Sequence, residues 1–314
     1  MLNQPPAVFL MGPTASGKTE LALMLAEYLP CEIISVDSAQ VYCGMDIGTA
    51  KPSLALRHRY PHHLIDILDP AEAYSAGRFC TDALALMKAI SEQGRIPLLV
   101  GGTMLYFHAL KYGISPLPPA NPEIRAAIDK EAMVKGWGEL HRRLAEVDPV
   151  TAQRIHSHDP QRIQRALEVF QLTGRPLSEL IVDSRKFSLP YQVITLVLAP
   201  KERATLHARI ERRFCAMLEV GFLEEVKRLF MRPDLSIESS SIRAVGYRQA
   251  WFYLQGRFSF PVMVERAITA TRQMAKRQLT WLRRENNAMH IDPEEKDYAR
   301  KIWRRIDRAL TQVS

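Results

Sequence analysis

The residues with the clearest capacity for chemistry lie at positions 12–19, which read Gly-Pro-Thr-Ala-Ser-Gly-Lys-Thr. The Gly-x-x-x-x-Gly-Lys-Thr spacing is typical of a phosphate-binding loop, in which glycines let backbone N–H groups turn toward phosphate oxygens. Lys18 adds a cation, and in such a loop the hydroxyl at the position of Thr19 can hold Mg²⁺. The predicted contacts to a diphosphate or triphosphate are Gly12, Pro13, Thr14, Ala15, Ser16, Gly17, Lys18 and Thr19.

The segments around this loop have the order that such a loop requires. Residues 7–11 (AVFLM) predict a buried parallel strand, and residues 20–29 have apolar side chains at helical spacing. Further apolar runs predict strands at residues 32–36, 96–100 and 192–198. Strands alternating with helices favour an α/β fold with a P-loop NTPase-like parallel sheet core.

A different pattern separates the last two of these strands. Residues 115–122 are rich in proline, and residues 123 to about 180 predict several helices and no strand. We therefore expect an inserted all-helical domain at residues 118–189, within a core formed by residues 1–117 and 190–314.

The acidic residue nearest to the loop follows the strand at residues 32–36. A P-loop kinase or ATPase usually has an apolar strand ending in an aspartate that anchors Mg²⁺. Residues 96–100 run instead into Gly101, Gly102 and Thr103, whereas residues 32–36 end at Asp37. Asp37 should lie at the same sheet edge as the loop. It could serve as a Mg²⁺ ligand, as a general base or as an N-cap, and Thr103 could likewise cap a helix.

Composition and charge narrow the class of protein. The chain is 47% hydrophobic and 24% charged, and its four cysteines form no Cys-x-x-Cys pair. No apolar run approaches the length of about 20 residues that spans a bilayer, and no secretory signal is visible, so we expect a soluble, cytoplasmic protein without a membrane partner. Residues 201–314 hold 23 Lys/Arg against 14 Asp/Glu. This excess fits either a nucleic-acid surface or a solvated helical surface.

Six segments occur in a fixed order along the chain. After the loop come SVDSAQ at residues 35–40, GMDIGTAKP at 44–52, GGT at 101–103, SIRAVGYRQ at 241–249 and TRQMAKRQLTW at 271–281. Together the six segments closely resemble bacterial tRNA dimethylallyltransferases, which prenylate the adenosine next to the anticodon. The resemblance covers nearly the whole chain, from near residue 5 to near residue 290.

The resemblance implies that the loop holds dimethylallyl diphosphate, with Mg²⁺ as cofactor. Diphosphate leaves while the exocyclic amine of adenosine attacks, so a base is needed and Asp37 is the candidate. The implied catalytic residues are Asp37, Lys18 and Thr14, and Arg243 is a further diphosphate contact.

The resemblance also implies an anticodon stem-loop as the partner, with the helical domain clamping the RNA, and we expect the protein to be a monomer. The implied tRNA contacts are Asp37, Ser38, Ala39, Gln40, Thr103, Arg125, Gln161, Arg162, Ile163, Gln164, Arg165, Ile242, Arg243, Ala244, Val245, Gly246, Tyr247, Lys276 and Arg277.

Two other functions remain compatible with the loop alone. One is a nucleotide-binding P-loop kinase that acts on a nucleotide or small molecule, with the helical insert as a lid over ATP. The other is a non-catalytic RNA-binding protein that retains the loop.

Overall fold

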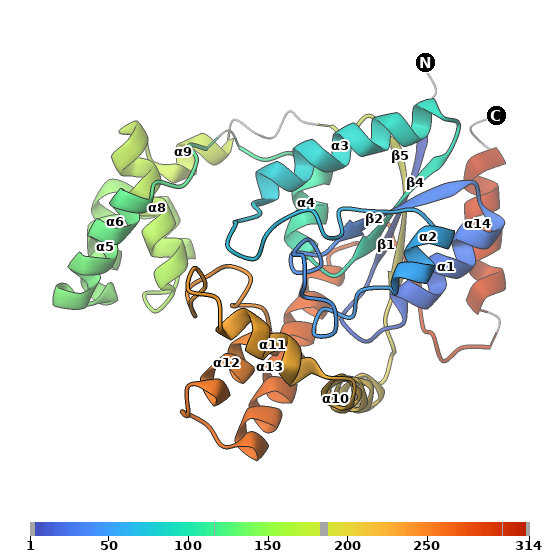
Figure 1. The fold of residues 1–314 in the computed structure, drawn as a ribbon. Helices are drawn as coiled ribbons and strands as arrows, with labels where there is room; N and C mark the ends of the chain where they lie inside the picture. The colour runs from blue at the N-terminus through green and yellow to red at the C-terminus, as the bar shows by residue number, and fades with distance from the viewer. Residues whose placement is uncertain (1–3, 116, 183–187, 297, 312–314) are drawn as a thin grey trace. The chain divides into compact units, whose positions relative to one another are not determined.

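The computed structural model describes residues 4–115, 117–182, 188–296 and 298–311. The strands in these residues form one parallel sheet in the order β3-β2-β4-β1-β5-β6 (Figure 1). They are β1 (Pro6–Met11), β2 (Cys31–Val36), β3 (His62–His63), β4 (Ile96–Gly101), β5 (Gln192–Leu198) and β6 (Met289–Ile291). The parallel sheet confirms the predicted α/β class and all four predicted strands.

The chain divides into two compact units. The core unit comprises Met1–Phe107 and Pro190–Ser314, and the helical unit comprises His108–Leu189. The helices of the core unit are α1 (Lys18–Tyr28), α2 (Leu54–Arg59), α3 (Ala76–Glu92), α10 (Arg203–Glu219), α11 (Phe222–Phe230), α12 (Tyr247–Leu254), α13 (Phe260–Leu282) and α14 (Tyr298–Thr311). Helix α4 (Met104–Tyr112) begins in the core unit and ends in the helical unit.

Helices cover both faces of the sheet. On one face, α1 and α14 bury apolar residues against the strands, and Leu25 and Ile306 belong to the same buried cluster as Leu10. On the other face, α4 packs through Phe107, whose ring centroid lies 5.3 Å from that of Phe9. Figure 1 shows the strands between these two sets of helices. Successive side chains of a strand point to opposite faces of the sheet. Because helices cover both faces, β1 is apolar throughout.

The carboxyl ends of the three central strands lie in register, which brings their following loops together. Val36 of β2 and Met11 of β1 both pair with Gly101 of β4. A Cβ atom at Gly101 would lie 2.0 Å from the Val36 carbonyl oxygen, so only glycine fits at this strand end. The loops that begin at Gly12, Asp37 and Gly102 therefore leave one edge of the sheet.

The helical unit has an apolar core of its own. It contains α5 (Pro122–Lys135), α6 (Trp137–Val147), α7 (Pro149–Arg154), α8 (Pro160–Thr173) and α9 (Leu177–Val182). Leu140 and Leu144 of α6 are buried against Ile163 and Leu167 of α8. This unit begins at His108, whereas the sequence predicted a boundary at residue 118. Leu117, in the segment before α5, packs against the apolar core of the unit.

Glu168 is the polar centre of the helical unit. Its side chain is fully buried and accepts hydrogen bonds from the Asn121 N–H (2.8 Å), from the Arg125 guanidinium (2.8 and 3.0 Å) and from Arg165 (2.6 Å). Burial alone would raise the pKa of the Glu168 carboxyl, but the arginine hydrogen bonds outweigh it and hold the pKa below its usual value.

We expect Glu168→Gln to destabilise the helical unit by about 3 kcal/mol, since charge-assisted hydrogen bonds contribute about 1.5–3 kcal/mol each. Because the pKa of Glu168 is lower in the folded protein than in the unfolded chain, its contribution is present above pH 5 and disappears as the pH falls through the folded value. The protection factors of α8 amides in the full chain, which correct for the intrinsic pH dependence of hydrogen exchange, should therefore fall on acidification in the wild type and less so in Glu168→Gln. Glu179→Gln, which changes a half-exposed partner of Arg175, is the control; equal effects of the two variants would contradict the prediction.

Among the described residues, no helix has the length and apolar character that crossing a bilayer requires. All four cysteines are free, and only Cys31 is buried.

Candidate active site

A cavity of about 250 Å³ lies at the carboxyl ends of the central strands. Three loops contribute its polar wall: the phosphate-binding loop after β1, the loop after β2 and the loop after β4. The lining residues from these loops are Thr14, Ala15, Lys18, Thr19, Asp37, Ser38, Ala39, Gln40, Gly101, Gly102 and Thr103. The structure thus brings together loop residues that the sequence predicted to meet.

The phosphate-binding loop leads directly into α1. A Cβ atom at Gly12 would lie 2.3 Å from the Leu198 carbonyl oxygen of β5, so the loop can pass this strand only as glycine. Gly17 precedes α1 with a φ of 95°, a left-handed conformation that side chains disfavour. Helix α1 therefore begins at the cavity, which Lys18 and Thr19 line, and the N-terminal N–H groups of a helix attract anions.

Two cations, Lys18 and Arg213, face this cavity. The Lys18 ammonium donates to the Pro13 carbonyl oxygen at 2.7 Å, and within the described residues neither cation has a carboxylate partner. Burial, helped by the charge of Arg213 and opposed by Asp37, lowers the pKa of Lys18 to about 7. Burial likewise lowers the pKa of Arg213, against an opposing effect of Asp37. Two basic groups removed from water, with no carboxylate partner among the described residues, suit the binding of a multivalent anion, whose charge favours their protonated forms.

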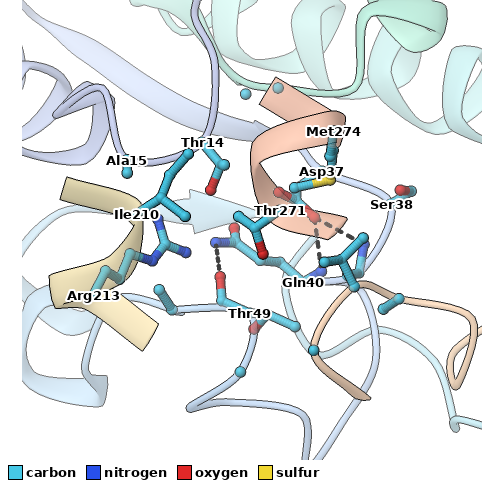
Figure 2. Close-up of a pocket in the computed structure, with 18 of the residues that line it drawn as sticks. Thr14, Ala15, Asp37, Ser38, Gln40, Thr49, Ile210, Arg213, Thr271 and Met274 are labelled. Carbon is cyan, nitrogen blue, oxygen red and sulfur yellow. Dashed lines mark hydrogen bonds between the residues drawn. The ribbon is translucent and has the colours of Figure 1, made fainter. Parts of the chain in front are cut away.

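Asp37 has one oxygen occupied and one available. Its Oδ1 accepts from the N–H groups of Ala39 (2.8 Å) and Gln40 (3.3 Å), as the dashed lines in Figure 2 show. Among the described residues, Oδ2 has no hydrogen-bond donor. The side chain therefore caps its own turn, as one of the sequence interpretations had it, and still presents a carboxylate oxygen to the cavity.

Thr103 connects the loop after β4 to the loop after β2. Its hydroxyl oxygen accepts a hydrogen bond from the Ser38 N–H at 3.1 Å. Gln40 is held at both ends of its amide: its Nε2 donates to the Thr49 carbonyl oxygen (3.2 Å), and its Oε1 accepts from the Ser35 hydroxyl (2.9 Å).

Gln278 of α13 connects the phosphate-binding loop to the loop after β4. Its Oε1 accepts from the Thr14 N–H at 3.0 Å, and its Nε2 donates to the Gly102 carbonyl oxygen at 2.8 Å. One side-chain amide thus fixes the spacing of two walls of the cavity.

We expect Gln278→Leu to weaken binding of a diphosphate ligand about tenfold, because two neutral hydrogen bonds contribute about 0.5–1.5 kcal/mol each. Titration calorimetry with inorganic diphosphate measures the effect. Gln273→Leu, on an exposed face of the same helix, is the control and should bind as the wild type does. Equal affinities of all three proteins would contradict the bridging role.

The far wall of the cavity is apolar. Its side chains come from α10, α11 and α13: Ile210, Phe214, Met217, Phe222 and Met274. Figure 2 shows Ile210, Arg213 and Met274 around the same space as Thr14 and Asp37. A ligand with a charged end and a short apolar end would match both walls.

Several predicted site residues lie behind the cavity wall or away from it. Gly12, Pro13, Ser16 and Gly17 support the loop without lining the cavity, and the buried Ser16 hydroxyl has no hydrogen-bond partner among the described residues. Ala244, Val245, Gly246 and Tyr247 line it, whereas Ile242 is buried outside it. Arg243 also lies outside the lining and pairs with Glu238 at 2.6 Å. Lys276 and Arg277 are exposed on α13.

The predicted RNA contacts of the helical unit have varied surroundings. Gln161 and Arg162 are exposed, and Arg162 pairs with Asp159 at 3.3 Å. Ile163 is fully buried, and Gln164 donates to Asp129 at 2.6 Å. Arg125 and Arg165 share the Glu168 carboxylate described above.

Sequence reasoning missed the residues that helices α10 and α13 bring to the cavity. Ile210, Arg213, Phe214 and Met217 follow helical spacing, which is usually the mark of a core-facing stripe. One feature of the sequence could have identified this side of the cavity: Arg213 is the single arginine in the apolar stripe, and a charge among apolar side chains needs a partner.

The donors around the loop fit a hard, oxygen-preferring cation. No group of three or more His, Cys, Asp or Glu able to hold a metal occurs in the described part of the chain. Thr19 and Asp37 both line the cavity and offer oxygen atoms. Mg²⁺ keeps several waters and binds through few protein oxygens together with phosphate oxygens, so this sparse set suits it.

The fold and the cavity define a P-loop α/β protein whose cavity has basic side chains on one side and an apolar wall on the other. The family model of the IPP transferases matches residues 40–285. This chain belongs to the IPP transferase family.

Relatives cover the whole chain. A tRNA dimethylallyltransferase of Nitrosococcus oceani is 80% identical over 314 residues, which is 100% of both chains. One of Thioalkalivibrio sulfidiphilus is 58% identical over 300 residues, 96% of this chain and 94% of the relative.

Solved structures agree with the fold. The full-length tRNA isopentenylpyrophosphate transferase of Bacillus halodurans is 36% identical, with a TM-score of 0.72 and coverage of 98% of this chain and 97% of that one. A eukaryotic dimethylallyltransferase described as acting on tRNA is 28% identical, with a TM-score of 0.77 over 92% of this chain and 74% of that one. These neighbours support the P-loop NTPase-like description of the core.

Proposed function

We propose that this protein transfers a dimethylallyl group from dimethylallyl diphosphate to the exocyclic amine of the adenosine adjacent to a tRNA anticodon. One observation carries the proposal: among the described residues, the cavity combines two basic side chains that no carboxylate neutralises, an apolar wall and one carboxylate with a free oxygen. The relatives named above are tRNA prenyltransferases, which supports the same reading.

The donor would bind with its diphosphate on the loop and its isoprenoid on the apolar wall. Lys18, Arg213 and the N–H groups at the start of α1 supply positive charge for the phosphate oxygens. Phe214, Met217 and Met274 supply the surface against which a branched five-carbon chain is removed from water. Charge that develops on the departing diphosphate is stabilised by groups already oriented toward it.

The acceptor amine would lie at Asp37. An exocyclic adenine amine is a weak nucleophile because its lone pair is delocalised into the ring, so the loss of a proton must accompany attack. The new C–N bond forms at the allylic carbon, the C–O bond to the diphosphate breaks, and Asp37 Oδ2 receives the amine proton. Oδ1 stays bound to the Ala39 and Gln40 N–H groups and holds the carboxylate in place.

Thr19 would hold Mg²⁺ together with phosphate oxygens of the donor, and Thr14 would donate its hydroxyl to the same phosphates. When bound, the ion would neutralise part of the charge on the leaving diphosphate.

The RNA must present a base that is turned out of its stack, at a cost of a few kcal/mol that is smaller in a loop than in a duplex. Ser38, Gln40 and Thr103 lie beside Asp37 and offer contacts to such a nucleotide. Gln161 and Arg162 of the helical unit, and Lys276 and Arg277 of α13, are exposed and suit phosphate contacts. RNA affinity should therefore fall as salt rises. We further propose that the helical unit clamps the anticodon stem and that the enzyme acts in the cytoplasm as a monomer.

A kinase would need different features. The β4 strand ends at Gly101 without the acidic residue that anchors Mg²⁺ in kinases, and one wall of the cavity consists of apolar side chains from α10, α11 and α13. Both observations favour a prenyl diphosphate over ATP.

The proposal is tested by incubating the purified protein with Mg²⁺, radiolabelled dimethylallyl diphosphate and a synthetic anticodon stem-loop. We expect label in the RNA, at the adenosine next to the anticodon, and none in a stem-loop with uridine there. Absence of transfer together with ATP consumption on another acceptor would replace the proposal by the kinase reading.

A further inference from the structure

Among the described residues, a buried glutamate on α11 accepts four hydrogen bonds and pairs with no cation. The Glu225 side chain is 1% exposed, and its Oε2 accepts from the N–H groups of Asp46 and Ile47, both at 2.8 Å. Its Oε1 accepts from the Gly48 N–H at 3.0 Å and from the Tyr247 hydroxyl at 2.5 Å. A buried carboxylate is costly unless fully bonded, and these four donors satisfy both of its oxygens.

Tyr247 remains a donor in this arrangement. Burial and the neighbouring Glu225 carboxylate raise the pKa of its hydroxyl above the ordinary value, so the phenol keeps its proton.

The segment that Glu225 binds is also confined on its other sides. A Cβ atom at Gly48 would lie 2.4 Å from the Phe222 ring and 2.5 Å from the Tyr247 ring, so the backbone rests directly on both rings. The buried Lys51 ammonium pairs with Asp46 at 2.8 Å and also with Asp66. Residues 46–51 therefore form a fixed loop, which we call the anchored loop.

The anchored loop leads to the acceptor side of the cavity. Gly48, Thr49 and Ala50 line the cavity, whereas Glu225 does not. The Thr49 carbonyl oxygen accepts the Gln40 side-chain N–H, and the Gln40 backbone N–H binds Asp37 (Figure 2). A continuous set of contacts thus runs from Glu225 through the anchored loop to the Gln40 side chain, and the Gln40 backbone N–H binds Oδ1 of Asp37.

We infer that Glu225 is a positioning residue for the acceptor nucleotide: it touches no substrate, and it sets the place of Gln40 through the anchored loop. The inference rests on the proposed function, because it takes the acceptor adenosine to bind on the Gln40 side of the cavity. The donor side is reached by other residues, Lys18 and Arg213, so the two substrates should respond differently to a change at Glu225.

The first test is Glu225→Gln, which keeps the size of the side chain but turns one acceptor oxygen into an NH₂ group facing N–H or O–H donors. We expect kcat/KM for the stem-loop RNA to fall about 10- to 100-fold, as loss of one or two buried hydrogen bonds predicts. The Kd for dimethylallyl diphosphate should stay within about twofold of the wild-type value. Glu224→Gln removes the same charge from the neighbouring exposed residue and is the control. An equal loss of donor affinity in Glu225→Gln would overturn the inference.

The second test asks whether Glu225 acts through Gln40. In a Gln40→Ala background, the effect of Glu225→Gln on kcat/KM should shrink to about twofold or less, because residues acting in series are not additive. A full effect in both backgrounds would overturn the inference.

The third test does not depend on activity. Hydrogen exchange at the amides of Asp46, Ile47 and Gly48 should accelerate in Glu225→Gln and remain at the wild-type rate in Glu224→Gln.

If Glu225→Gln does not fold, Tyr247→Phe takes its place. This variant removes one of the four donors and keeps the ring, and it should accelerate exchange at Gly48. Unchanged exchange at these amides would overturn the anchoring step. A wild-type protein that transfers no label while exchange responds as expected would instead reject the proposed function.

Discussion

Replacement of Asp37 by asparagine is expected to slow prenyl transfer by about 10²–10⁴-fold, the usual contribution of a general base. Asparagine keeps an Oδ1 that can accept from the Ala39 and Gln40 N–H groups, and it converts the free Oδ2 into a group that cannot take a proton. Affinity for RNA and for dimethylallyl diphosphate should therefore remain close to the wild-type values. Asp37→Ala should lose turnover as well, and with it the cap of the turn.

Single-turnover transfer to a stem-loop, together with separate binding measurements for each substrate, distinguishes these effects. Asp292→Asn is a matched control, because Asp292 also caps its own turn, through the Glu294 N–H (3.0 Å), and does not line the cavity. Full activity of Asp37→Asn would eliminate Asp37 as the base.

The second large effect is expected from Lys18→Ala. Removing one partner of a buried, hydrogen-bonded charge pair costs about 2–5 kcal/mol, so the Kd for the donor should rise about 30-fold or more. Because Lys18 would contact phosphate and not the isoprenoid, inorganic diphosphate and dimethylallyl diphosphate should be weakened by the same factor. Titration calorimetry with both ligands measures this.

Lys88→Ala, an exposed lysine of α3, serves as the control. An unchanged affinity in Lys18→Ala would remove the phosphate-binding role from the loop, and a loss confined to the prenylated ligand would move that role to another cation such as Arg213.

The strands that the sequence predicted are those whose own residues form a buried apolar run. β1, β2, β4 and β5 each contain at least six residues and are largely buried. The edge strands β3 and β6 were not predicted, because they have only two and three residues, too few to show a periodic pattern. The two residues of β3, His62 and His63, are also not apolar. Only the pairing of His62 with Ile33 and of Met289 with Leu196 makes them strands.

The same limit applies to the candidate site. The phosphate-binding loop and Asp37 could be predicted because each is defined by a contiguous motif at the end of a strand. Gln278 and Glu225 could not, since the backbone groups of the loops that they bind lie 176 to 264 positions away in the sequence. Arg213 could not either, because the loops with which it lines the cavity come from the other end of the chain. Arg243, predicted at the diphosphate, faces Glu238 outside the lining, and α10 supplies Arg213 to the cavity instead.

The division of the core unit into two chain segments has a consequence for biosynthesis. During translation the chain reaches β5, the neighbour of β1, only after the whole helical unit of residues 108–189 has been made. The helical unit is contiguous and has its own apolar core, so it can fold while the sheet is still incomplete. Until residues 192–198 emerge from the ribosome, one side of the apolar β1 has no partner, and an unpaired apolar edge is a site of aggregation. The nascent chain is therefore most vulnerable while its helical insertion is being synthesised.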